Sequence, residues 1–437
     1  MKYRRPQAPA ASPWRSHALR GVLLSLALSS VALAGVAPAV AQNAPQSNSA
    51  KSAEPANSAE SVDPAARKIV IGYLRRAEKG SAVSRLQLPA ENDGEAGALA
   101  GIDDDNASGE FLGQNFSLVT RRLKPGEDAA QALGELAGQG VQFVIADLPA
   151  GALVNAADIP AAAKLLIFNV GAPDDILREE FCRANVVHVA PTRSMLADAL
   201  AQYLIWKQWR KWFFVVGSHP EDRLWADALK RAGARFGAKF VEERIFEDHG
   251  GARRSDSGVA LVQKQIPTFT QGVAAYDVLV AADENAVFAD YLPFRTWDPR
   301  PVAGSAGLVP TSWDASNEQW GATQLQQRFE RKFGRPMTPL DMNSWTAARM
   351  IGEAAAHDAA DDAAAMKGYF LSKDFALAAF KGQKLTLRDW NLQLRQPILL
   401  SDGRNVVATS PQEGFMHQFS ELDTLGYDRP ESKCRFK

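Results

Sequence analysis

The stretch AGIDDDNASGEFLGQNF, residues 100–116, offers the densest group of potential metal-binding oxygens in the chain. Read from Asp104, it spells D-x-N-x-S-G, which is how an EF-hand calcium loop begins. The twelfth position of such a loop should be a bidentate glutamate, but Asn115 stands there, and Leu112 takes the ninth position. The segment has an apolar helical side, and Gly109 suits the left-handed residue that ends many helices. We interpret the stretch as a helix terminus and keep the calcium loop as the alternative.

No motif typical of catalysis accompanies these acids. The chain contains no G-x-S-x-G, S-x-x-K, Walker A or G-x-G-x-x-G motif, and no C-x-x-C or H-E-x-x-H pattern for zinc. His219 follows a strand pattern and precedes a helix pattern, so it is placed to face a ligand, although a surface-loop histidine is the commoner case. We therefore expect a protein that is not an enzyme and that needs no cofactor. The alternative from another class, an exported α/β hydrolase, requires a nucleophile and a nearby base at one strand end, and the sequence offers none.

Apolar strand patterns alternate with helical patterns from residue 68 onward. The expected strands span 68–74, 116–123, 141–147, 164–170, 212–217, 239–246 and 277–283. The expected helices span 94–106, 128–138, 192–206, 222–236, 258–266, 317–333 and 338–356. This alternation is typical of βαβ units, so we predict an α/β fold with two doubly wound, mostly parallel sheets. After residue 384 the pattern indicates a polar hairpin that turns at Asp402–Gly403.

The N-terminal residues have the composition of an export signal. In 1–41, five basic residues precede an apolar run at 22–36, and Ala39-Val40-Ala41 matches a cleavage site. An uncleaved anchor is the alternative, although the run is short for a membrane span. Residues 42–67 are rich in Ala, Ser, Asn and Pro, which predicts a disordered linker. Cleavage would leave 49 − 5 = 44 basic against 50 acidic residues, a formal charge of −6 that argues against nucleic-acid binding.

The two cysteines, Cys182 and Cys434, are far apart in the sequence. In an exported protein an even count favours a disulfide over free thiols. We therefore predict that these two residues are bonded to each other.

Several stretches resemble a known family. IVIGYL, followed by a helix that ends GALAGIDDDNASGEFLGQNFSLV, resembles the opening of type I periplasmic solute-binding proteins, in particular the leucine/isoleucine/valine-binding branch that serves ABC importers. The resemblance continues through VVHVAPTRSMLADALAQYL, the usual crossover into the second lobe, and covers roughly residues 68–410. It implies two lobes joined by a hinge. The implied division is 68–188 plus 306–360 for the first lobe, 189–305 plus 361–420 for the second, and 421–437 as a tail.

Three further stretches are similar to one subfamily of that branch. YLRRAEK, FNVGAPDDILR and LGYDRPESKCRF look like the subfamily encoded beside alcohol dehydrogenase systems that depend on pyrroloquinoline quinone (PQQ). This resemblance implies a monomeric, periplasmic substrate-binding component that captures a small polar solute by hinge closure and passes it to a membrane permease. It also implies a link to quinoprotein alcohol oxidation. The alternative is a receptor for calcium or a lanthanide in the same system.

Ligands of open α/β sheets sit beyond the carboxyl ends of the strands. That rule predicts ligand contacts from Arg75, Asp147, Gly171, Ala172, Ser218, His219 and Asp283. In amino-acid-binding relatives, the loops that match 146–148 and 171–173 clasp the ligand's carboxylate. Here those loops read Ala-Asp-Leu and Gly-Ala-Pro, and an aspartate repels a carboxylate. The acids therefore favour a cationic or metal-bearing group.

A structural explanation competes with this one, because acids at these places also cap helices. We favour capping for Asp175 and Glu284. For Asp147 and Asp283 the sequence leaves both explanations open.

Overall fold

The computed structural model describes residues 67–76, 89–248 and 261–436. The expected signal at 1–41 lies outside the described residues, as does the expected linker at 42–67 except for its last residue, with which the first strand begins. In the described part of the chain, no helix has the length and apolar character needed to cross a membrane.

The first lobe is built on a five-stranded parallel sheet in the order β2-β1-β3-β4-β5. Its strands are β1 (Arg67–Arg75), β2 (Gln114–Arg122), β3 (Phe143–Asp147), β4 (Leu166–Asn169) and β5 (Val186–His188). Side chains alternate across β1, so Ile69 and Ile71 face one core while Val70 and Leu74 face another. Both faces are covered, which explains why these strands read as nearly continuous apolar runs.

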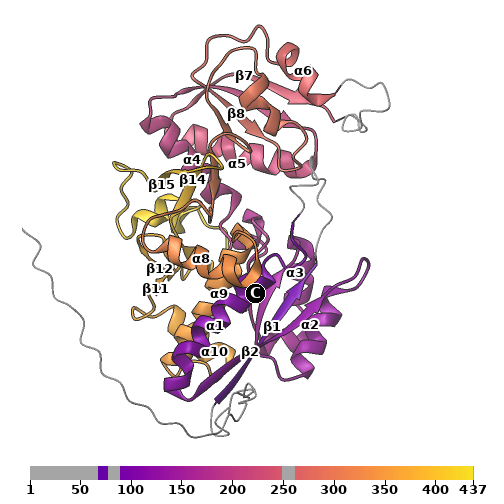
Figure 1. Ribbon diagram of the computed structural model, residues 1–437, viewed down its shortest axis with the longest axis vertical. Coiled ribbons are helices and arrows are strands. Elements are labelled where there is room, and N and C mark those ends of the chain that lie inside the picture. The colour runs from indigo at the N-terminus through magenta and orange to yellow at the C-terminus, as the bar shows by residue number, and fades with distance from the viewer. Residues whose placement is uncertain (1–66, 77–88, 249–260, 437) are drawn as a thin grey trace, which may run out of the picture. The chain divides into compact units, whose positions relative to one another are not determined.

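Helices on both faces complete this lobe, and Figure 1 shows α1 and α9 on one side of β1 and α2 on the other. They are α1 (Glu95–Leu112), α2 (Ala129–Gly138), α3 (Ala150–Ala157), α8 (Ala322–Phe333), α9 (Pro339–Ala356) and α10 (Ala363–Phe370). The predicted start of α9 is confirmed: the Thr338 hydroxyl accepts the amide of Asp341 at 3.1 Å, and the Asp341 carboxylate accepts the amide of Thr338 at 3.0 Å. A Cβ at Gly97 would lie 1.9 Å from the Asp341 carbonyl oxygen, so only glycine lets α1 pack this closely on α9.

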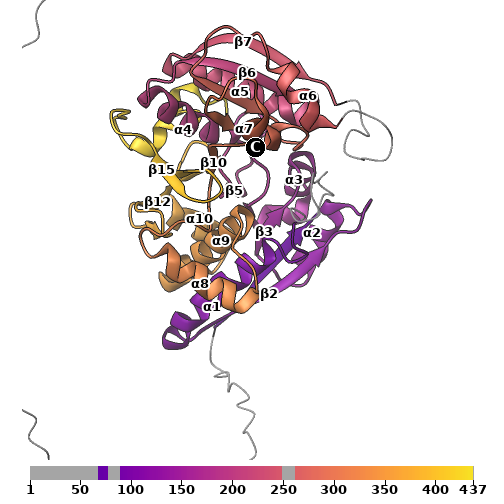
Figure 2. The same cartoon turned by 45° about the horizontal axis from the view of Figure 1, so that its top comes forward.

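The second lobe is built on a four-stranded parallel sheet in the order β7-β6-β8-β9. Its elements are α4 (Arg193–Trp206), β6 (Lys211–Gly217), α5 (Pro220–Phe236), β7 (Lys239–Phe246), α6 (Val262–Phe269), β8 (Val278–Ala282), α7 (Leu292–Arg295) and β9 (Val302–Gly304). Trp212 and Phe214 of β6 pack with α4 and α5, whereas Phe213 and Val215 pack with α6. Figure 2 shows α5 alongside β6.

Two small sheets come from the last third of the chain. Their strands are β10 (Val309–Thr311), β14 (Ile398–Ser401) and β15 (Val406–Ser410) in one, and β11 (Leu377–Ala378), β12 (Lys384–Leu387) and β13 (Leu394–Arg395) in the other. The predicted hairpin is confirmed, because β14 and β15 pair antiparallel and the amide of Asp402 donates to the Asn405 carbonyl at 3.2 Å. Gly403 has a φ of 80°, which suits glycine in this turn. Short 3₁₀ turns complete the structure at η2 (Pro160–Lys164), η3 (Asp175–Arg178), η4 (Ala289–Tyr291), η5 (Glu421–Thr424) and η6 (Arg429–Glu431).

The division between the lobes differs from the one implied by the resemblance. Phe370, Leu377 and Leu394 belong to the same buried cluster as β1, so residues 363–394 build the first lobe and not the second. Ile398 and Leu400 join the cluster of the second lobe. The chain therefore leaves the first core between residues 394 and 398, and not near 360, because the apolar side chains of this stretch cover the first sheet.

The predicted disulfide between Cys182 and Cys434 is present, and it closes a loop across a sequence separation of 252. Both residues are buried. The C-terminal segment is therefore fixed covalently to the loop that follows η3.

Candidate functional site

Arg75 and Asp147 meet at the carboxyl edge of the first sheet. They are the last residues of β1 and β3, and the parallel register places them side by side. Arg75 Nε lies 3.1 Å from Asp147 Oδ2, with 8% and 17% of the two side chains exposed. Arg75 also donates to the carbonyl oxygens of Glu91 at 3.1 Å and Asp93 at 2.6 Å. Its guanidinium is thus held by the protein, and the carboxylate of Asp147 is the more exposed partner.

Gly171 makes room for that carboxylate. A Cβ at position 171 would lie 2.3 Å from Asp147 Oδ1, closer than any real side chain would allow. The glycine is half-buried, and it follows β4 at the same edge of the sheet. A side chain at position 171 would therefore displace the Asp147 carboxylate, which the sequence alone did not indicate.

Ala172 is in a different situation. Its amide donates to Asn169 Oδ1 at 3.0 Å, and its carbonyl accepts from Asn169 Nδ2 at 2.9 Å. Arg178 donates to the same carbonyl at 2.9 Å. Because these backbone groups are already bonded within the protein, we no longer expect Ala172 to hold a solute through its backbone.

Arg178 is a residue that sequence reasoning missed. Its buried guanidinium donates to three carbonyls, those of Ala172 (2.9 Å), Asp174 (3.0 Å) and Ala190 (2.8 Å), and to Gln393 Oε1 at 2.9 Å. Burial lowers the pKa of Arg178 to about 10. The side chain fixes the loop after β4 to two segments where the chain passes between the lobes. No pattern in the sequence distinguishes this arginine from an exposed one.

Asn343 is a second missed residue, and it reaches the same edge from α9. Its Nδ2 donates to the carbonyl of Val170, directly after β4, at 3.0 Å. The sequence predicted this helix over residues 338–356. It did not show that the first turn of the helix packs on the carboxyl end of the sheet.

In the second lobe, Ser218 and His219 follow β6 and share one partner, Asp248. The Ser218 hydroxyl accepts the amide of Asp248 at 3.1 Å, and His219 Nε2 lies 3.0 Å from Asp248 Oδ2. The imidazole is 39% exposed. Ligand contact by either residue stays a prediction. Asp248 is a third polar residue at this place, and the sequence analysis did not identify it.

Asp283 has a structural role. Its buried carboxylate accepts the amides of Val287 at 2.9 Å and of Phe288 and Ala289 at 2.7 Å each. A carboxylate turned into its own loop in this way organises the segment after β8. The prediction that Asp283 contacts the ligand is therefore withdrawn in favour of the capping explanation.

The remaining acids are also paired. Arg193, the first residue of α4, lies 3.0 Å from Asp174 Oδ1 through NH1 and 2.8 Å from Glu284 Oε2 through Nε. Asp175 accepts the amide of Ser194 at 3.2 Å, so it caps α4 and not its own turn. Arg193 thus neutralises one acid that follows β4 and one that follows β8. This pairing weakens the case for a cationic or metal-bearing ligand held by Asp174 and Glu284.

The aspartates of residues 103–105 lie within α1, as the helix interpretation predicts. Each faces a cation on a neighbouring helix: Asp103 with Lys332, Asp104 with Arg328, and Asp105 with Arg349. The left-handed residue that ends α1 is Gly113, with a φ of 64°, and not Gly109. Across the described ranges 67–76, 89–248 and 261–436, no three His, Cys, Asp or Glu side chains are grouped to hold a metal ion.

Comparison with known proteins bears on the fold. Residues 86–252 match the family model described as periplasmic binding protein. No curated protein matches the chain significantly.

Three solved structures are similar over most of their length. A periplasmic ligand-binding protein of a branched-chain amino-acid ABC transporter from Burkholderia xenovorans has a TM-score of 0.62 and 18% identity, covering 78% of this chain and 95% of that one. A periplasmic binding protein from Burkholderia mallei has a TM-score of 0.59 and 16% identity, covering 84% and 98%. A solute-binding protein of an ABC transporter from R. palustris, in complex with benzoate, has a TM-score of 0.57 and 13% identity, covering 84% and 100%. The chain therefore has the two-lobed α/β fold of type I periplasmic binding proteins.

Proposed function

We propose that this protein is a periplasmic substrate-binding component of an ABC importer, which captures a small polar solute by hinge closure. The observation that carries the proposal is the pair of parallel sheets whose carboxyl ends present polar groups, with Arg75, Asp147 and Gly171 in one lobe and Ser218 and His219 in the other. Open α/β sheets bind ligands at this edge. The similar structures whose names include an ABC transporter support the same role.

We do not expect the solute to be held in the way that amino-acid-binding members of the leucine/isoleucine/valine-binding branch hold the carboxylate of their ligand. A carboxylate would meet Asp147, and the backbone of Ala172 is already bonded to Asn169. An amine or a neutral polar solute fits Asp147 better, because the carboxylate accepts hydrogen bonds and repels anions. The proposed connection to PQQ-dependent alcohol oxidation is supported by the sequence stretches alone.

The first test is native mass spectrometry of protein purified from its own periplasm, where a tightly bound solute co-purifies. The second is a thermal-shift panel of branched-chain amino acids, benzoate, small amines, polyols, calcium and a lanthanide. A true ligand at 100 times its Kd stabilises the protein by about 2.7 kcal/mol, which is readily measured. Absence of any co-purified solute together with a flat panel would count against the proposal, and a shift by calcium or the lanthanide alone would replace it with the metal-receptor alternative.

A matched pair of variants then locates the site. Asp147→Ala removes the carboxylate at the edge of the first sheet, whereas Asp103→Ala removes an exposed ion-paired carboxylate on the outer helix. Titration calorimetry should show weaker binding for Asp147→Ala and unchanged binding for Asp103→Ala. Equal affinities in both variants would remove Asp147 from the site.

A further inference from the structure

The C-terminal segment 421–434 contacts both lobes. It lies after the last paired strand, contributes no strand to either sheet, and contains only the short turns η5 and η6. Its contacts fall into three groups: one on the first lobe beside Cys182, one on the arginines after β12, and one on helices α4 and α5 of the second lobe.

The anchor on the first lobe is covalent. Cys434 is bonded to Cys182, and next to it the amide of Lys433 donates to Glu179 Oε2 at 2.5 Å. Lys433 Nζ also lies 3.1 Å from Glu180 Oε1. Residues 179–182 precede β5 of the first sheet.

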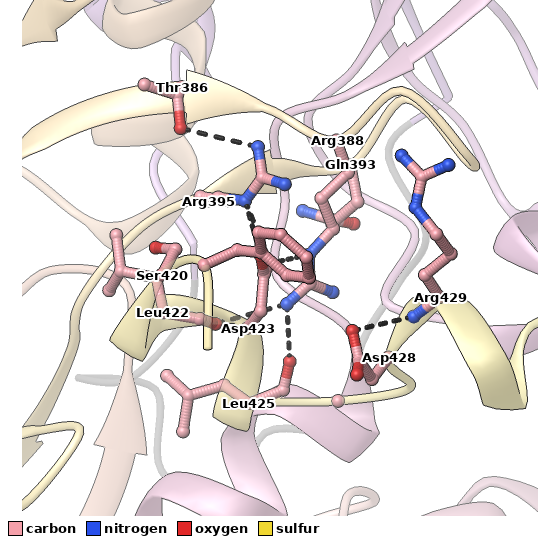
Figure 3. A network of polar contacts seen from close by, with 12 residues as sticks. Thr386, Arg388, Gln393, Arg395, Ser420, Leu422, Asp423, Leu425, Asp428 and Arg429 are labelled. Carbon is pink, nitrogen blue, oxygen red and sulfur yellow. Dashed lines mark hydrogen bonds and ion pairs between the residues drawn. The ribbon is translucent and has the colours of Figure 1, made fainter. Parts of the chain in front are cut away.

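The middle anchor is a buried charge cluster on the first-lobe side of the last crossing. Figure 3 shows Arg388 and Arg395 converging on Asp423, with Nε-to-Oδ1 distances of 2.9 and 2.8 Å. Arg388 also donates to the carbonyls of Leu422 at 3.1 Å and Leu425 at 2.8 Å. Since a buried guanidinium without acceptors is costly, this cluster holds η5 firmly against β12 and β13.

The anchor on the second lobe is centred on Gly426. Its amide donates to Asp198 of α4 at 2.8 Å, while its carbonyl accepts from Arg231 at 3.0 Å and Arg235 at 2.9 Å, both on α5. Gly426 has a φ of 80°, and a Cβ there would lie 2.8 Å from a carbon of Met195. Only glycine therefore allows the segment to approach α4 this closely.

We propose that residues 421–434 form a strap that restrains the rotation of the two lobes about their hinge. The crossings of the peptide chain between the lobes allow rotation, but a segment bonded to α4 and α5 at one end and to Cys182 at the other adds a further connection. Eight residues separate position 426 from position 434, so the reach of the strap is limited to roughly 28 Å even when it is fully extended. Larger opening would require breaking the Asp198–Gly426–Arg235 contacts. The biological meaning of the strap rests on the proposed solute capture, because the strap would limit how far the lobes open before they close on a solute.

The experiment measures the distance between the lobes without ligand, so it is independent of the solute and of the proposed function. Nitroxide labels are attached at Glu110→Cys and Arg223→Cys, two exposed positions on α1 and α5. The native cysteines are bonded to each other and do not take the label. Pulsed electron–electron double resonance then gives the distribution of distances between the labels.

Three variants are compared in this labelled background. Cys182→Ala/Cys434→Ala/Asp423→Ala releases both first-lobe anchors, the disulfide and the charge cluster, and Arg235→Gln weakens the second-lobe anchor while keeping the disulfide. Lys230→Gln is the matched control on α5, since it removes an exposed ion pair with Glu243 that lies wholly within the second lobe. Circular dichroism confirms that each variant is folded.

The strap predicts a broader distribution with a population at longer distances in the alanine triple variant, a smaller broadening in Arg235→Gln, and no change in Lys230→Gln. Wild-type distributions in both strap variants would overturn the proposal, and so would an equal broadening in the control. If the triple variant does not fold, Arg235→Gln against Lys230→Gln decides the question.

Discussion

Lys381 is a buried lysine whose charge depends on folding. It is 1% exposed, and its Nζ donates to Gln396 Oε1 at 2.6 Å, while Gln396 in turn donates to the carbonyl of Val189 at 2.6 Å. Burial lowers the pKa of Lys381 from 10.5 to about 7, because the buried ammonium loses its hydration. We predict that Lys381→Met makes the protein more stable near neutral pH and removes a pH-dependent part of its stability.

The magnitude follows from the two pKa values. Between pH 7 and 10.5 the unfolded chain keeps a proton on this lysine that the folded chain has lost, so the free energy of unfolding rises with pH. The difference of about 3.5 pH units, at 1.36 kcal/mol each, gives roughly 5 kcal/mol as an upper figure. Below pH 7 both states are protonated and the contribution levels off. Methionine keeps the length of the side chain and loses one hydrogen bond, worth about 1 kcal/mol.

The assay is urea unfolding of the wild type and of Lys381→Met at several pH values from 6.5 to 9.5. The advantage of the variant should shrink steadily as the pH rises, while Lys384→Met, at an exposed lysine of β12, should follow the wild type throughout. Parallel stability curves for wild type and Lys381→Met would show that the lysine stays charged when folded, and the reasoning would fail.

Three more outcomes are expected. Asp283→Ala should lower the free energy of unfolding by at least about 1–3 kcal/mol, because three buried amides lose their acceptor. Solute affinity, measured by calorimetry, should change little. A large loss of affinity in a fully folded variant would return Asp283 to the site. Gly171→Ala should cost about 1–3 kcal/mol in thermal unfolding through the clash with Asp147, whereas Gly151→Ala on α3, where a Cβ meets nothing within 4 Å, should not; equal melting temperatures would refute the close contact. Removing the disulfide with Cys182→Ala/Cys434→Ala should lower stability by up to about 5 kcal/mol for a loop this long, and an unchanged urea midpoint would contradict that.

The aspartates at residues 103–105 show how a stretch that resembles a calcium-binding motif can instead form part of a helix. An apolar helical side and the missing glutamate at the twelfth loop position were enough to prefer a helix over a calcium loop, and α1 does extend through these aspartates. Their partners Lys332, Arg328 and Arg349 lie more than two hundred residues away in the sequence, so no local pattern could pair them. The end of the helix was misplaced for a related reason. Gly109 is a helical residue that lets the Gln114 backbone approach closely, a tertiary requirement that mimics a capping signal.

The predicted lobe boundary near residue 360 was wrong because the sequence of a short strand does not indicate which of two hydrophobic cores the strand packs against. The apolar side chains of β12 and β13 fit either sheet by pattern alone, since period-2 alternation specifies a buried face but not its partner. The sequence resemblance implied a return to the second lobe at that point. In the folded chain, α10 and β11–β13 instead cover the first core.

By itself the sequence determined the α/β class, most of the strands and helices, the turn at Asp402–Gly403 and the pairing of the two cysteines. These depend on local periodicity, on backbone preferences of single residues, and on there being one possible pairing. Only the tertiary structure decided the state of each candidate side chain: Asp147 beside Arg75 and Gly171, Asp283 turned into its own loop, and Ala172 bonded to Asn169 and Arg178. The physical reason is that a carboxylate is available to a ligand only when its own chain leaves it acceptor capacity and exposure, and both are set by residues distant in sequence.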